Sequence, residues 1–166
     1  AASVVSHLIG FAYAVHLLCP ETVRDGHADL PVDIDAAMDA LAVTALAPPL
    51  ELAQLARSGQ GLLAGGGLCV AILAPRDEPI LHRIASLRQP GGTAVGLVLD
   101  TDSFTRRPGE RATGRPSPTA LAAARTVDLL RGSGWRATVV SAGDGIPEVW
   151  SRVGAVSSRA AQAVAR

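Results

Sequence analysis

Residues 94–99 of the chain read AVGLVL, and Asp100-Thr101-Asp102-Ser103 follow at once. The run is short and apolar, as expected of a strand that is covered on both faces. Three other runs are similarly short and mostly apolar: Tyr13–Cys19, Leu68–Leu73 and Arg136–Val140. The sequence therefore predicts four short strands in a mainly parallel sheet.

Longer stretches with helical spacing of apolar residues separate these strands. Ser117, followed by Pro118, forms a helix start, and Gly132 marks the end of the same helix. Alternating strands and helices predict an α/β fold, a three-layer sandwich with right-handed crossovers. The expected helices are one that ends near Ile9, then Asp33–Leu46, Leu50–Arg57, Asp77–Arg88, Ser117–Arg131 and Ile146–Val153.

Composition narrows the possible partners. The 166 residues suit one domain, with 48% apolar residues but only 3% aromatic ones, so Ala, Val, Leu and Ile must form the core. The formal net charge is zero, which gives no electrostatic reason to expect nucleic-acid binding. Four arginines lie among Pro and Gly and predict a solvated loop, with a phosphate site as the alternative: Arg106, Arg107, Arg111 and Arg115.

Two further features of the sequence bear on the state of the cysteines and on membrane insertion. Cys19 and Cys69 both lie in apolar runs, and we interpret them as small buried side chains rather than disulfide partners or nucleophiles. Residues 1–20 carry no Asp, Glu, Lys or Arg, so insertion of this segment into a membrane is one hypothesis. Interruptions by Ser, His and Gly favour a helix followed by a strand instead.

The acidic pair after the strand at 94–99 is the sharpest local motif. Carboxylates at a strand end can hold Mg²⁺, which prefers oxygen ligands, so Asp100, Asp102 and Ser103 are weak metal-ligand candidates. Phosphatases of the haloacid-dehalogenase type use DxDx(T/V) at such a place. Phe104 stands where that motif has Thr or Val, which argues against this class.

Two other interpretations of the acidic pair remain. A von Willebrand A-type metal site needs DxSxS after its first strand, and the chain has no such motif. Alternatively, Asp100 and Asp102 cap turns or pair with Arg106 or Arg107 as the chain leaves the sheet. We favour this structural role, because a motif without its context is only a hypothesis.

Other motifs do not add a cofactor or metal site. The glycines of 59–67 follow a helix and precede a strand, the reverse of a dinucleotide-binding loop. The four histidines show no metal-ligand spacing, and no serine lies in GxSxG. Ser141–Gly145 is expected to be a turn, or else a backbone anion site. We therefore expect no cofactor and no catalytic residues.

The order of segments along the chain is more informative than any one motif. It comprises Ala1–Val5 and Tyr13–Leu18, the helix Asp33–Leu46, the run Leu97–Asp102, and Ser117–Trp135 leading into Ala137–Val140 and Pro147–Trp150. Over residues 1–153 this order resembles actinobacterial members of a bacterial family labelled domain of unknown function 58. That family often occurs beside MoxR-type AAA+ ATPases.

The resemblance implies a von Willebrand A-like α/β domain over 1–153, lacking its first strand, with an Ala/Ser-rich tail over 154–166. It also implies a membrane-anchored parent protein, with this part on the cytoplasmic face. The expected function is a non-catalytic interaction module that docks a MoxR-type ATPase. A Mg²⁺-dependent phosphohydrolase that uses Asp100 and Asp102 is the alternative.

Overall fold

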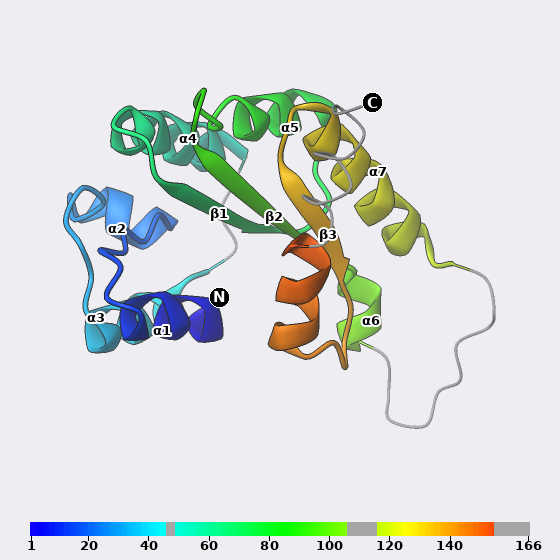
Figure 1. Cartoon of the computed structure of the whole chain (residues 1–166), viewed down its shortest axis with the longest axis horizontal. Helices are drawn as coiled ribbons and strands as arrows, with labels where there is room; N and C mark the ends of the chain where they lie inside the picture. The colour runs from blue at the N-terminus through cyan, green and yellow to red at the C-terminus, as the bar shows by residue number, and fades with distance from the viewer. Residues whose placement is uncertain (46–48, 106–115, 155–166) are drawn as a thin grey trace. The chain divides into compact units, whose positions relative to one another are not determined.

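A computed structural model describes residues 1–45, 49–105 and 116–154 (Figure 1). The chain divides into two compact units, residues 1–65 and 66–166, where the sequence suggested one domain over 1–153. Most of the predicted tail and all four loop arginines lie outside the described residues.

The first unit is helical. Its elements are α1 (Ala2–Gly10), α2 (Pro20–Arg24), α3 (Ile34–Val43) and α4 (Pro49–Leu63). Helix α3 contacts α1 and α2, and α2 also contacts α4. Asp33 begins α3 as predicted, because its carboxylate accepts the Ala36 N–H at 2.8 Å. Among the described side chains of this unit, the buried apolar ones are Val4, Val5, Cys19, Ala37 and Ala56.

The strand predicted over Tyr13–Cys19 is wrong. These residues form an irregular connection between α1 and α2, and Tyr13 is 58% exposed. One backbone bond from another segment reaches this stretch, from the Val32 N–H to the Val15 carbonyl at 2.8 Å. A strand needs a neighbouring strand to complete its ladder. The described part of the first unit contains none.

The glycine-rich region also differs from the prediction. Helix α4 was expected to stop at Ser58–Gly59, but it continues through Gly59 and Gly61 to Leu63. A glycine inside a helix costs about 1 kcal/mol relative to alanine and does not end it. The chain leaves the helical conformation before Gly66 and Gly67, which have positive φ angles of 86° and 120°.

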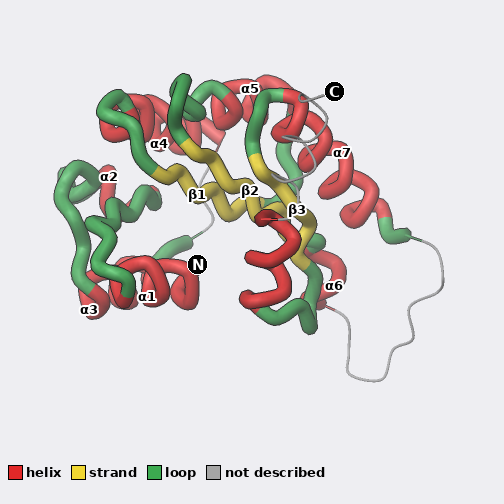
Figure 2. The backbone as a smooth tube through the Cα atoms, viewed as in Figure 1, coloured by secondary structure: helices red, strands yellow, loops and turns green. Residues whose placement is uncertain are grey.

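The second unit contains the predicted parallel sheet (Figure 2). The strands β1 (Leu68–Leu73), β2 (Thr93–Leu99) and β3 (Arg136–Val140) pair in the order β1-β2-β3. Three of the four predicted strands are thus confirmed. Helix α5 (Glu78–Ala85) joins β1 to β2, and a helix over 146–154 follows β3. The fold is a mixed α/β arrangement with a three-strand parallel sheet flanked by helices.

Between β2 and β3, the described residues 100–105 and 116–135 include two helices. The first is α6 (Thr101–Thr105), a single turn that the sequence analysis did not expect. The second is α7 (Pro118–Gly132), whose boundaries match the prediction closely. Ser117 is the N-cap of α7 as expected, since its Oγ accepts the Ala120 N–H at 3.1 Å.

Helix α7 packs on β2 and β3 and closes the core on one face of the sheet. A Cβ atom on Gly96 would lie 3.0 Å from Leu130 Cδ1 and 3.1 Å from Ala137 Cβ, so Leu130 occupies the space that a larger residue in β2 would need. Trp135 is buried, and its Nε1–H donates to the Ala85 carbonyl of α5 at 3.0 Å. This bond ties α5 to the entry of β3.

Truncation of Leu130 tests this packing. Leu130 is fully buried, whereas Leu121 on the same helix is 50% exposed. We expect Leu130→Ala to lower the free energy of unfolding by about 2–5 kcal/mol, because it leaves a cavity over Gly96. Leu121→Ala should change it by less than about 0.5 kcal/mol. Urea unfolding of the two variants measures the difference, and equal losses would contradict the packing described.

Candidate functional site

The predicted acidic motif lies at the carboxyl ends of β2 and β3, beside the turn that follows β3. Parallel strands end at the same edge, where α/β proteins place their binding residues. Asp100 follows β2 directly, and its N–H donates to the Val140 carbonyl at the end of β3, at 2.9 Å. The motif therefore begins as a continuation of the β2–β3 ladder.

Asp100 is buried, with 6% of its surface exposed. Its Oδ1 accepts a hydrogen bond from Thr119 Oγ1 at 3.0 Å. The Thr119 hydroxyl lies 3.0 Å from Ser117 Oγ, the N-cap oxygen of α7. The carboxylate thus links the first turn of α7 to the end of β2, a contact other than the turn cap or arginine pairing expected from the sequence.

Ser103 connects the two strand ends. Its Oγ donates to the Asp100 carbonyl at 2.6 Å and accepts the Ala142 N–H at 2.8 Å. Ala142 lies in the turn after β3, 39 residues away in the sequence. Asp102 is half-buried in the first turn of α6, and its side chain makes no hydrogen bond to any other described residue.

The three metal-ligand candidates therefore do not act as one set. Asp100 and Ser103 meet through the Asp100 backbone carbonyl, while the Asp100 carboxylate is directed to Thr119. Among residues 1–45, 49–105 and 116–154, no three His, Cys, Asp or Glu side chains lie together as a metal site requires. The predicted pairing with Arg106 or Arg107 lies outside the described residues.

The turn after β3 is stabilised by a pair that the sequence analysis missed. Asp144 Oδ2 accepts the Ser141 N–H at 2.8 Å, and Arg152 contacts both Asp144 oxygens at 2.9 and 3.1 Å. The Arg152 hydrogen bonds, and secondarily the Ser141 N–H, lower the pKa of Asp144. Residues Ser141–Gly145 therefore form a turn in which the Asp144 carboxylate accepts the Ser141 N–H. This N–H is then not available to an external anion.

The same edge of the sheet carries exposed apolar side chains. Phe104, on α6 after β2, is 54% exposed, and Ile146, at the start of the helix after β3, is 37% exposed. The Ser103–Ala142 hydrogen bond joins the two segments that carry them. Aromatic residues are enriched where proteins contact one another, relative to the rest of the surface.

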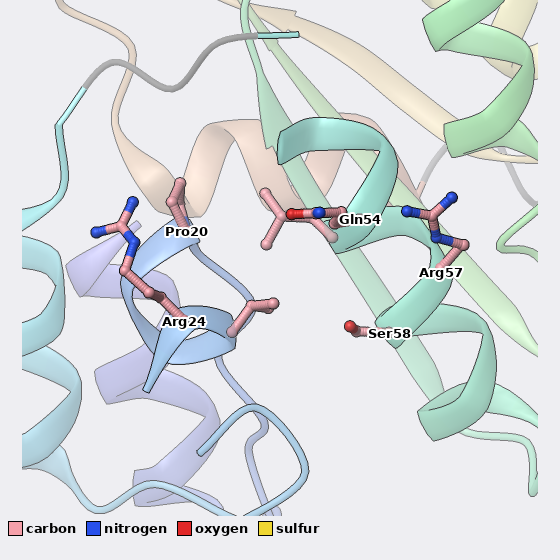
Figure 3. A pocket seen from close by; sticks show the side chains of 7 residues that line it. Pro20, Arg24, Gln54, Arg57 and Ser58 are labelled. Atoms are coloured by element: carbon pink, nitrogen blue, oxygen red, sulfur yellow. The ribbon is translucent and has the colours of Figure 1, made fainter. Parts of the chain in front are cut away.

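A separate hollow of about 370 Å³ lies in the helical unit, between α2 and α4 (Figure 3). Among the side chains that the structure describes, none that lines the hollow is acidic, and the lining mixes apolar, amide, hydroxyl and guanidinium groups. The lining residues are Pro20, Val23, Arg24, Gln54, Leu55, Arg57 and Ser58.

Both cysteines are free thiols. Cys19 is buried at the start of α2, with its Sγ 3.7 Å from Thr22 Oγ1. Cys69 is half-buried in β1, and burial raises the pKa of its thiol to about 11. A thiol that is activated for catalysis has a lowered pKa, whereas the pKa of Cys69 is raised. Its surroundings therefore do not activate Cys69 as a nucleophile.

Comparison with protein-family models, curated proteins and solved structures found no match for this chain. In the part of the chain that the structure describes, none of the helices has both the length and the apolar character needed to cross a membrane.

The raised pKa of Cys69 predicts slow alkylation. At pH 8 its thiolate fraction should be about a hundredfold below that of an ordinary thiol, and iodoacetamide labelling should slow by about tenfold or more, because a thiolate of higher pKa is intrinsically more nucleophilic. The rate should rise as the pH approaches 11. Mass spectrometry of the Cys69 peptide measures the rate, with urea-unfolded protein as the control. Equal rates in the folded and unfolded chains at pH 8 would contradict the prediction.

Proposed function

We propose that this chain is a non-catalytic protein-interaction module and that a MoxR-type AAA+ ATPase is its partner. The proposal rests on the resemblance described above and on one structural observation. That observation is the exposure of Phe104 at the carboxyl edge of the sheet, next to a residue that is firmly held.

Phe104 has the properties of an interface anchor. Its ring is more than half exposed, and exposed aromatic residues supply much of the binding energy at protein interfaces when a partner covers them. The preceding residue, Ser103, is fixed by two hydrogen bonds to the ends of β2 and β3. This attachment limits the backbone entropy that docking would otherwise remove.

The neighbouring polar groups support binding rather than chemistry. Asp100 is committed to Thr119, and Asp144 to Arg152 and the Ser141 N–H, so both carboxylates maintain the shape of the edge. Asp102 lies on the same short helix, α6, as Phe104. An apolar centre with polar groups around it is the usual composition of a protein interface.

The finer placement of the module belongs to the same proposal. We place the chain in a von Willebrand A-like fold without its first strand, as the C-terminal part of a membrane-anchored parent on its cytoplasmic face. The support is the order of segments in the sequence. The structure contributes the coarser fact of a three-strand parallel sheet flanked by helices.

The interaction is tested by a pull-down of a purified MoxR-type ATPase with and without nucleotide. We expect nucleotide-dependent retention by the wild-type chain and at least about tenfold weaker binding by Phe104→Ala. Leu121→Ala removes a similarly exposed apolar side chain, 50% against 54% for Phe104, from α7 and is the matched control. Retention that is absent with every nucleotide, or equal for the two variants, would overturn the proposal.

A Mg²⁺-dependent phosphohydrolase is the second candidate, because Asp100 is a buried carboxylate at a strand end with a hydroxyl at 3.0 Å. Its test is hydrolysis of a generic phosphomonoester with Mg²⁺ present. On the interaction proposal, wild type and Asp100→Asn both stay at the buffer rate. Magnesium-dependent turnover that Asp100→Asn abolishes, while urea unfolding shows the variant folded, would establish the enzyme instead.

A further inference from the structure

The first unit has few basic side chains apart from histidine, and both of them line one hollow. Residues 1–65 contain seven Asp and Glu residues, two arginines and no lysine. The two arginines, Arg24 and Arg57, both line the hollow of about 370 Å³ between α2 and α4. The described side chains that line it include no carboxylate. In a unit that is otherwise acidic, this hollow therefore has the charge that attracts an anion.

The walls of the hollow belong to the first unit. Its described lining comes from α2 and α4, two helices that contact each other. Residues 1–65 therefore determine the shape of these walls, wherever the second unit lies. The volume falls within the range of small-molecule sites, about 300–1,000 Å³. Figure 3 shows Arg24 on α2 and Arg57 on α4 at opposite sides of the hollow, with the Gln54 amide between them.

Three side chains of α4 bring hydrogen-bond donors to this hollow. Arg57 and Ser58 lie three and four residues after Gln54, so all three are near one another on the helix surface. Their donors are an amide, a guanidinium and a hydroxyl group. Within the part of the chain that the structure describes, these three side chains form no hydrogen bond or ion pair. Their donors are therefore available to a ligand.

The rest of the lining is apolar. Pro20 and Val23 contribute from α2, and Leu55 contributes from α4. All three are half-buried, so part of each surface is left for a ligand to cover. Ligand sites commonly combine apolar walls of this kind with a few polar groups that set the orientation of the ligand. The hollow therefore fits a molecule that has both an anionic group and an apolar body.

We propose that the hollow binds a small phosphomonoester with an apolar body. The planar guanidinium of Arg57 matches two phosphate oxygens at once. A phosphomonoester offers three terminal oxygens to the donors of Arg57, Gln54 and Ser58, whereas a carboxylate offers two. Arg24 adds attraction from the opposite wall, and its five N–H donors allow it to contact a ligand and another group together. The apolar body lies against Val23 and Leu55.

Titration of the full chain with phenyl phosphate, followed by two-dimensional NMR of the backbone amides, is the first test. We expect saturable shifts of the Val23, Leu55 and Ser58 signals, and no shift of Asp100, where the alternative phosphohydrolase would bind its substrate. Inorganic phosphate lacks the apolar body and should bind at least about tenfold more weakly. Benzoate has two charged oxygens and should bind several times more weakly, and neutral phenol should not saturate.

Two arginine variants locate the anionic group. Arg57→Gln removes the charge and keeps a polar side chain at an exposed position of α4. It should weaken phenyl phosphate binding at least about tenfold, because it removes charged hydrogen bonds to the phosphate. Arg125→Gln makes the same change at an exposed position of α7 and is the matched control. Its affinity should equal that of the wild type.

Several results would overturn this proposal. They are the lack of saturable shifts, shifts confined to residues 66–166, equal affinity for phenyl phosphate and either inorganic phosphate or benzoate, and equal affinity of the two folded variants. If Arg57→Gln does not fold, the ligand series on the wild-type chain decides. The proposed ATPase contact at Phe104 belongs to the other unit, so the two proposals stand or fall separately.

Discussion

The second unit depends on the contact between α7 and the centre of the sheet. Leu130 occupies the space above Gly96, where a side chain on β2 would collide with it, and Ala137 on β3 closes the same space from the side. Close packing of this kind leaves a helix little room to shift on a sheet, because a change of even one methylene group in the core is felt. The position of α7 in turn sets where its first turn, with Ser117 and Thr119, meets Asp100.

The candidate site follows from that placement. Once α7 and β3 are fixed against β2, the strand ends meet, and short hydroxyl side chains bridge them. The buried carboxylate of Asp100 finds a donor in Thr119, which offsets part of the cost of removing a charge from water. Hydrogen bonds thereby hold the polar groups at this edge in place, while more than half of the Phe104 surface is exposed to solvent.

Sequence patterns predicted the helices and strands whose formation depends mainly on the residues within them. The strands at 68–73, 93–99 and 136–140 are short apolar runs covered by neighbours, and α7 has both its cap and its glycine end. Tyr13–Cys19 has a comparable pattern but no partner strand in its unit, so pairing, which is a non-local property, decided against it. The continuation of α4 through Gly59 likewise shows that one unfavourable residue does not end a helix.

The site was less predictable for a similar reason. Asp100 and Ser103 were identified by their position after a strand, but their partners lie 19 and 39 residues further on. The Asp144–Arg152 pair has no motif beyond an acidic and a basic residue eight positions apart. Such contacts form only when loops that are distant in the sequence meet at one edge of the sheet, and the spacing of residues within a motif does not predict this.

The position of the two tryptophans also gives each unit a different optical signature. Trp135 and Trp150 both belong to residues 66–166, and the single tyrosine, Tyr13, belongs to residues 1–65. Indole emission therefore reports on the α/β unit alone, with Trp135 buried beneath α5 as its most sensitive part. Circular dichroism at 222 nm records the helices of both units. A difference between the two signals during denaturation would show the units melting one after the other.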